Sequence, residues 1–195
     1  MTEVGTTDQH EPYEQIAAVG VVPTDGRGSL PFALLHGESL VAVASWALGE
    51  AGVELLDFDA SWELVRDRGG ALVVHDPLCP ATPVEFLRDT VAAGARGDEV
   101  VVAARPVTDT VKESHGDVVG ATVDRDGLVA VASPLVLPAS VVAALPGWPA
   151  LGDLADLVSW LRDRFPVRLV EAPALARRVT DESDLRMLEA SSDER

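Results

Sequence analysis

Short continuous apolar runs alternate along this chain with longer stretches in which apolar residues recur at helical spacing. The run at 16–22 ends at Pro23 and is typical of a central strand in a parallel sheet. Between Ser39 and Ala51 the apolar residues fall on one helix face, and Gly52 follows as a stop. The same alternation predicts further strands at 53–58, 71–74, 100–103 and 167–170, and further helices at 61–68 (capped by Ser61), 83–93 (stopped by Gly94), 139–145, 153–164 and 181–190.

This order of elements predicts a three-layer α/β/α domain, with a mostly parallel, Rossmann-like sheet covered on both faces. A chain of 195 residues that is 47% hydrophobic can bury one good core but not two. We therefore expect one domain at 15–190, a disordered polar leader at 1–14 and a disordered tail at 191–195.

Ligands of such sheets bind beyond the carboxyl ends of the strands. That rule places the loops at 24–29, 75–80 and 105–110 on one rim of the predicted sheet. Candidate chemistry is expected in these three loops.

A projecting β-arm is predicted at 106–133. Two alternating segments, 118–123 and 128–132, are separated by Asp126-Gly127. Asp-Gly between such segments favours a tight hairpin, because both turn positions accept positive φ. We expect the two segments to pair with each other across this turn.

Charge and cysteine content narrow the class of protein. A net charge of -17 argues against a nucleic-acid groove or an anionic membrane surface, but not against a small phosphorylated ligand. The single cysteine, Cys79, excludes an intramolecular disulfide and fits a reducing compartment. The leader shows no signal-peptide pattern, and prolines interrupt the longest apolar stretch, 128–145. The expected location is the cytoplasm.

The arm carries three motifs in order: Pro-Val-Thr-Asp-Thr-Val-Lys at 106–112, Thr-Val-Asp-Arg at 122–125 and Leu-x-Ala-Val-x-Ser-Pro at 128–134. This order resembles the methylerythritol phosphate cytidylyltransferase family of isoprenoid biosynthesis. The resemblance implies a nucleotidyltransferase-like fold and a reaction that joins CTP to methylerythritol phosphate with the help of Mg²⁺. It also implies a homodimer formed through the arm.

The resemblance assigns the acceptor side of that reaction. His75-Asp76-Pro-Leu-Cys79-Pro looks like the family's His-Asp-Ala-Ala-Arg-Pro, so Asp76 is expected to orient metal and phosphate. The residues implied to hold methylerythritol phosphate are Thr110, Arg125 (from the partner subunit's arm), Ser133 and Arg178. Ordinary alternatives remain open: a loop or capping aspartate for Asp76, a solvated turn residue for Arg125 and a surface charge for Arg178.

Other positions depart from the family pattern. Cys79 replaces the motif's arginine, and an uncharged thiol cannot clamp phosphate. A small buried filler suits Cys79 better than a nucleophile or a metal ligand beside His75. On the nucleotide side the chain keeps only Thr24, Gly26, Arg27 and Gly28, a pattern that also fits an ordinary strand-to-helix turn. Between Gly52 and Gly70 the chain is too short for the family's base-reading segment.

These features together predict a divergent homologue, shortened by one strand-helix unit. Its acceptor-phosphate site is partly retained and its CTP site is degraded, so it is weak or inactive. Any catalysis would depend on Arg27, Asp76, Arg125 and Arg178. The two alternatives are an active CTP-dependent cytidylyltransferase and a non-catalytic dimerising partner or regulator.

Overall fold

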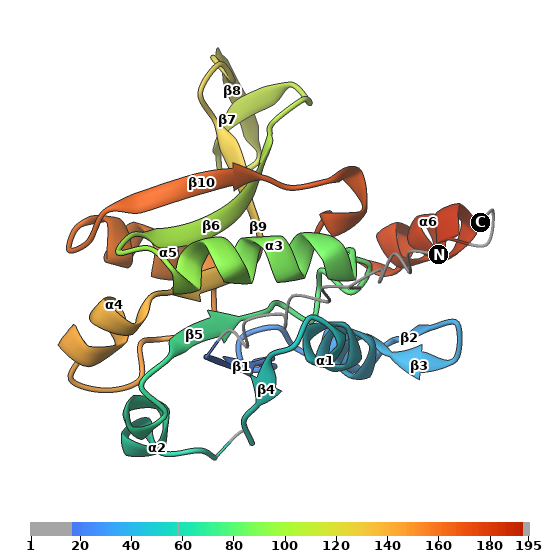
Figure 1. Cartoon of the computed structure of the whole chain (residues 1–195). Coiled ribbons are helices and arrows are strands. Elements are labelled where there is room, and N and C mark those ends of the chain that lie inside the picture. The colour runs from blue at the N-terminus through green and yellow to red at the C-terminus, as the bar shows by residue number, and fades with distance from the viewer. Residues whose placement is uncertain (1–16, 58, 193–195) are drawn as a thin grey trace, which may run out of the picture.

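The computed structural model describes residues 17–57 and 59–192, and Figure 1 shows the whole chain. The predicted leader at 1–14 lies outside the described residues. The last helix, α6 (Glu182–Ser192), extends into the first two residues of the predicted tail. Residues 193–195 also lie outside the described part.

The centre of the fold is a six-stranded sheet in the order β10-β6-β9-β5-β1-β4. Its strand β9 is antiparallel to both neighbours, and the other strands run parallel to one another, as predicted for a mostly parallel sheet. The strands of this sheet are β1 (Ala18–Val21), β4 (Glu54–Leu55), β5 (Ala71–Val74), β6 (Val100–Pro106), β9 (Val129–Leu137) and β10 (Val167–Glu171).

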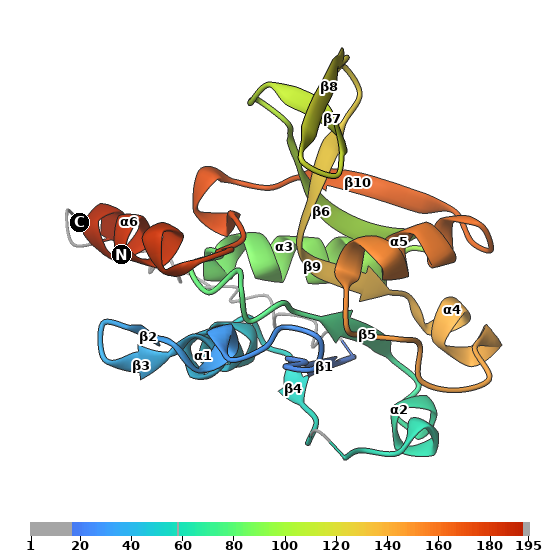
Figure 2. The same cartoon turned by 180° about the vertical axis from the view of Figure 1, so that it is seen from behind.

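Helices cover both faces of the sheet (Figures 1 and 2). They are α1 (Leu40–Glu50) and α3 (Val84–Ala95) on one face and α2 (Trp62–Asp67), α4 (Ala139–Ala144) and α5 (Leu154–Arg162) on the other. Helix α6 lies off the end of the sheet, where Leu185 and Leu188 pack against Leu35 and Leu40. Short 3-10 turns lie at Leu30–Phe32 and Ala174–Ala176. Ser39, Ser61 and Asp153 each accept a backbone N–H in the first turn of α1, α2 and α5, respectively, as helix caps do.

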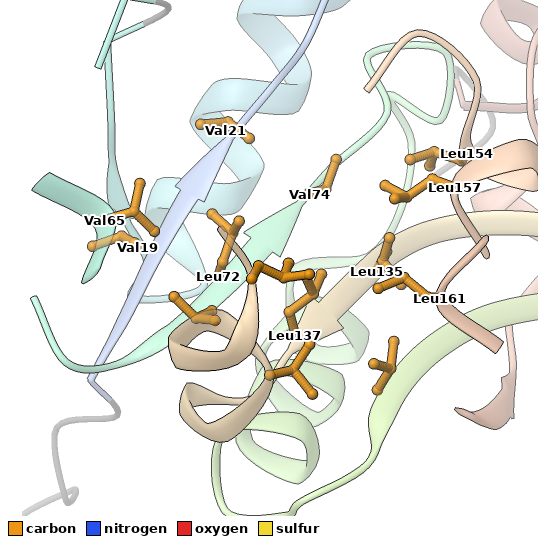
Figure 3. Packing of buried hydrophobic residues seen from close by; sticks show 14 of the residues in the cluster. Val19, Val21, Val65, Leu72, Val74, Leu135, Leu137, Leu154, Leu157 and Leu161 are labelled. Atoms are coloured by element: carbon orange, nitrogen blue, oxygen red, sulfur yellow. The ribbon is translucent and has the colours of Figure 1, made fainter. Parts of the chain in front are cut away.

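The alternation of side chains along the strands divides the core into two layers. Val19, Leu72 and Leu135 point to the face covered by α2, α4 and α5, where Figure 3 shows their packing. Ala18, Val73, Val101 and Val136 point to the opposite face, where they meet Leu48 of α1 and Val91 of α3. Successive residues of a strand face opposite sides, so continuous apolar runs are what a sheet buried on both faces requires.

The prediction that Gly94 ends its helix is wrong, since α3 continues to Ala95. A Cβ built at Gly94 would lie 2.5 Å from Val136 Cγ1. Gly94 therefore serves close packing of α3 on β9 rather than chain reversal.

The arm projects from the sheet, but its predicted pairing is wrong. Strand β8 (Val118–Val123) pairs with β7 (Val111–His115), across a turn at Gly116 with φ 65°. The segment after Asp126-Gly127 belongs to β9 and pairs with β6. Asp126-Gly127 does reverse the chain, because Leu128 N–H donates to the Arg125 carbonyl at 2.9 Å. However, β9 continues into the buried centre of the sheet, and the long β6 ladder decides its partner.

A second small hairpin, β2 (Leu34–Leu35) with β3 (Glu38–Ser39), precedes α1 and was not predicted. The strand predicted at 53–58 shortens to β4, at the edge of the sheet. Between Gly52 and Gly70 the described chain forms only β4 and α2, in line with a fold shorter than the family's.

Candidate functional site

The site lies at the carboxyl ends of β1 and β5. These strands are parallel neighbours, with Val21 beside Val74, so the loops that follow them meet at one edge of the sheet. Arg27 Nε lies 2.8 Å from Asp76 Oδ1, and Arg178 Nε lies 3.1 Å from Asp76 Oδ2. We call Arg27, Asp76 and Arg178 the Asp76 cluster. The predicted rim is confirmed for the first two loops.

Burial separates the two arginines of the Asp76 cluster. The Arg27 side chain is fully buried and that of Arg178 is 38% exposed, while Asp76 is 1% exposed as a residue. Arg27 Nη1 also donates to the carbonyls of Asp25 at 2.7 Å and Leu151 at 3.0 Å. Arg27 is therefore held by hydrogen bonds inside the protein, whereas the Arg178 side chain is partly exposed to solvent.

Ser133 fixes the loop that carries Asp76. Its Oγ accepts the Asp76 N–H at 2.8 Å and lies 2.5 Å from His75 Nδ1, and both side chains are fully buried. Burial lowers the pKa of His75 to about 4, although the Asp76 charge opposes this shift, so the imidazole is neutral at pH 7. The Ser133 hydroxyl is thus occupied within the protein, and its contact with a substrate stays a prediction.

The remaining residues predicted to hold the acceptor lie on the arm, where the structure does not join them to the Asp76 cluster. Thr110 and Arg125 are exposed, and Arg125 Nη1 donates to the Thr108 carbonyl within the arm. The residues predicted to hold methylerythritol phosphate therefore form two separate groups, one beside Asp76 and one on the arm.

The glycine loop after β1 is pressed against the loop at 146–153. Gly26 and Gly28 have φ of 76° and 58°, in the left-handed region that favours glycine. A Cβ built at Gly26 would lie 2.7 Å from the Gly152 carbonyl oxygen. The 146–153 loop is itself fixed by Trp148, whose Nε1–H donates to the Ala60 carbonyl at 2.9 Å and whose ring meets Trp62 edge-on at 5.1 Å.

Replacing Gly26 with alanine is expected to destabilise the fold by about 1–3 kcal/mol, because the new Cβ meets rigid backbone and the required φ is positive. Gly28→Ala is the matched control, since it shares the positive φ but has open space around the new Cβ. Chemical denaturation of both variants measures the difference. Equal destabilisation by the two variants would show that the contact with Gly152 carries no energy.

Two pockets flank the glycine loop. One, of about 910 Å³, lies between Gly26 and α5 and is walled by Trp148 and Trp160, with Asp153 and Asp156. The other, of about 580 Å³, lies between β1, β4 and α1 and contains Thr24, Asp25, Asp57 and Asp59. Among the described residues that line either pocket there is no lysine, arginine or histidine. Both pockets thus offer carboxylates and apolar walls rather than a phosphate cradle.

The hydrogen bonds of Asp76 decide whether this carboxylate could hold a metal ion. Asp76 Oδ1 accepts from Arg27 and from the Leu78 N–H at 3.0 Å, and Oδ2 accepts from Arg178. A carboxylate between two guanidinium groups is a poor ligand for a hard cation, which needs free oxygen lone pairs. Within the described ranges no three His, Cys, Asp or Glu side chains are grouped to hold a metal. The surroundings of Asp76 therefore do not fit Mg²⁺ bound to this carboxylate. Dependence of the protein on Mg²⁺ stays a prediction.

Cys79 is a buried filler, as expected. The residue is 0% exposed, and burial together with the Asp76 charge raises the pKa of its thiol well above the ordinary range. A thiol held in the protonated form is inert.

Two parts of the site were missed by sequence reasoning. The 146–153 loop supplies the Leu151 carbonyl to Arg27, and His75 anchors Ser133. The Gly-Trp-Pro run at 147–149 indicates an ordered turn in this loop. Nothing in that run indicates that the loop contacts Arg27.

None of the helices in the described part of the chain is long and apolar enough to cross a membrane. The fold resembles that of solved cytidylyltransferases: the 2-C-methyl-D-erythritol 4-phosphate cytidylyltransferase from Thermus thermophilus superimposes with a TM-score of 0.64 at 22% identity, covering 89% of this chain and 98% of that one. At this level of identity the likeness shows the fold.

The curated 2-C-methyl-D-erythritol 4-phosphate cytidylyltransferase of Halorhodospira halophila is 35% identical over 119 residues, which are 58% of this chain and 48% of the relative. That of Corynebacterium diphtheriae is 26% identical over 173 residues, covering 85% and 64%. The chain thus matches about half to two thirds of the length of these two relatives. The family model for 2-C-methyl-D-erythritol 4-phosphate cytidylyltransferase matches residues 59–193, more than half of the chain, and the chain therefore belongs to that family.

Proposed function

We propose that this protein is a divergent cytidylyltransferase homologue that keeps part of the acceptor-phosphate site and has lost strong CTP binding. The observation that carries the proposal is the state of Arg27. This cation of the glycine loop is buried, paired with Asp76 and bonded to two main-chain carbonyls. A side chain held in this way is not free to neutralise a triphosphate.

The chemistry explains why this loss matters. Nucleotidyl transfer brings one oxyanion onto a phosphorus already surrounded by negative charge, so catalysis depends on neutralisation and alignment by placed cations and N–H groups. Losing one such donor typically costs about a hundred- to a thousandfold in rate. Here the pockets beside the glycine loop contain aspartates instead of cations. Turnover is expected to be weak or absent.

The acceptor side is better supported. Asp76 holds Arg178 by its Nε, and the guanidinium is partly exposed at the rim. Thr110 and Arg125 are exposed on the arm and would complete the site if the arm of a second copy reached over it. No step is assigned to Mg²⁺, because Asp76 does not fit that ion.

Separate calorimetric titrations of methylerythritol phosphate and CTP test the proposal. We expect measurable binding of methylerythritol phosphate and little binding of CTP. Arg178→Met should weaken methylerythritol phosphate about 10- to 100-fold, since a hydrogen bond to a charged group contributes about 1.5–3 kcal/mol. Arg162→Met, at the exposed end of α5, is the control and should bind normally.

The opposite result would overturn the assignment. Tight CTP binding, with pyrophosphate released in the presence of methylerythritol phosphate and Mg²⁺, would establish an active cytidylyltransferase. Assays with and without Mg²⁺ at high protein concentration also test the metal prediction.

A second candidate function, a dimerising partner or regulator, is favoured by the surface of the arm. Val118 and Val119 of β8 are 67% and 72% exposed, and an isolated two-stranded hairpin is marginally stable until it packs on something. Sedimentation should show a dimer at micromolar concentration, and Val118→Ser with Val119→Ser should shift it toward monomer. A strict monomer for the unaltered chain counts against this function.

A further inference from the structure

The loop between α4 and α5 passes beside α5 (Figure 2), and a pocket of about 910 Å³ lies between them. One wall is formed by Asp153, Asp156, Leu157 and Trp160, which lie on one face of α5 and at its cap. The opposite wall is the run 146–150. No member of the Asp76 cluster lines this pocket. We call it the α5 pocket.

We propose that the α5 pocket binds an aliphatic diamine or a longer polyamine, in which methylene chains separate ammonium groups. The inference goes beyond the proposed function, because it uses none of the residues of the Asp76 cluster or of the arm. The pocket volume falls within the roughly 300–1,000 Å³ that small-molecule sites span.

Carboxylates line the pocket at the start of α5. Asp153 and Asp156 lie three residues apart there, and no described lining residue is cationic. The N-terminus of a helix has a partial charge of about +0.5, so two carboxylates leave this end of the pocket negative. Asp153 Oδ1 accepts the N–H groups of Ala155 and Asp156, but a carboxylate has lone pairs for further donors. An ammonium group supplies three N–H donors to such oxygens.

Tryptophan rings supply a second attraction for cations. Trp148 and Trp160 line the pocket, and Trp160 is 37% exposed. The guanidinium carbon of Arg164 already lies 4.3 Å from the centroid of the Trp160 ring, within the about 6 Å of a cation–π contact. Arg164 does not line the pocket, so the part of the Trp160 ring that does is open to another cation. The Trp148 wall is preformed, because its Nε1–H donates to the Ala60 carbonyl.

The order of these groups along α5 favours a chain with a charge at each end. Trp160 follows Asp153 by seven residues, which is about 10 Å along the helix axis. Leu157 lies between them, and Pro146 and Pro149 add apolar surface to the opposite wall. Methylene groups cover such surface, as the stems of lysine side chains do. A metal ion has no apolar body, and a quaternary ammonium has no N–H to donate.

Calorimetric titration of the full chain with putrescine, spermidine, butylamine and butanediol tests the inference. The titrations are made at low salt, because salt screens exposed charges. We expect putrescine to bind at least about threefold more tightly than butylamine, since a second ammonium adds one exposed ion pair or cation–π contact. Spermidine should bind at least as tightly as putrescine. Butanediol, which has the same length without charge, should show no binding.

Matched variants locate the site. Asp156→Asn should weaken putrescine about three- to tenfold, the effect of one partly exposed charge pair. Asp163→Asn changes the net charge equally at the other end of α5, outside the pocket, and should leave the affinity unchanged. Trp160→Leu should also weaken putrescine about three- to tenfold. Its control is Trp46→Leu, on α1, where the side chain is 63% exposed and outside the pocket.

Equal weakening by Asp156→Asn and Asp163→Asn would overturn the inference, because it would show only a diffuse attraction to a chain of net charge -17. Failure of both putrescine and spermidine to bind, or equal binding of butanediol, would overturn it as well. Methylerythritol phosphate is titrated in the same preparation, and Arg178→Met should leave putrescine binding unchanged. Putrescine binding without methylerythritol phosphate binding rejects the acceptor site alone, and the reverse result rejects the α5 pocket alone.

Discussion

Asp76→Ala is expected to lower the free energy of unfolding by about 3–5 kcal/mol, the usual cost of removing one partner of a buried ion pair. The substitution leaves the fully buried Arg27 guanidinium without its carboxylate. It also removes the acceptor for the Leu78 N–H. The bond to Arg178 adds little, because that side chain is 38% exposed and solvent screens the pair. Urea unfolding followed by tryptophan fluorescence measures the change.

A double-mutant cycle separates two causes of the lost stability: the unpaired charge of Arg27 and the removal of the Asp76 side chain itself. Arg27→Met removes the buried charge, so combining it with Asp76→Ala should restore part of the stability, with a coupling of about 1–3 kcal/mol. Asp117→Ala, at the exposed turn of the arm, is the control and should stay within about 0.5 kcal/mol of the unaltered chain. Additive effects of the two substitutions would mean that Arg27 and Asp76 do not act as a pair.

The fold could be predicted from the sequence largely because its strands are buried on both faces. Runs such as the one that forms β5 are continuous and apolar, and the helices between them have caps that can be read locally, such as Ser61. The pairing of the arm could not be predicted in the same way. Asp126-Gly127 specifies a turn, but the partner of the next strand is decided by the β6 ladder, which the local pattern does not contain.

The residues of the candidate site could be predicted from the sequence, but the hydrogen bonds that join them could not. Motif matching selected Arg27, Asp76 and Arg178, and the structure brings these three together. Their contacts join positions 49 and 102 residues apart, so no spacing rule shows that the arginines bind Asp76 rather than a ligand. The burial of Ser133 could not be predicted from the sequence either, since its hydrogen-bond partner His75 lies 58 residues away.

His75 is expected to make stability fall with acid between pH 6.5 and about 4. In the unfolded chain a histidine takes up a proton near pH 6.5, whereas burial lowers the pKa of folded His75 to about 4. Within this window the unfolded state binds more protons, so the free energy of unfolding decreases as pH falls. A shift of this size corresponds to stability on the order of 3 kcal/mol, fully present above pH 6.5 and lost toward pH 4.

The histidine contribution must be separated from the carboxylates that titrate in the same range. His75→Gln removes the titrating group, so the difference between its stability curve and that of the unaltered chain isolates the histidine. That difference should change steadily with pH between 6.5 and 4, in favour of the variant at low pH. His115→Gln is the control, because the His115 side chain is 75% exposed and its loss should leave the profile unchanged. Parallel profiles for His75→Gln and the unaltered chain would mean that folded His75 takes up its proton as readily as unfolded His75. The neutral imidazole that holds Ser133, and with it the Asp76 loop, would then be the wrong protonation state.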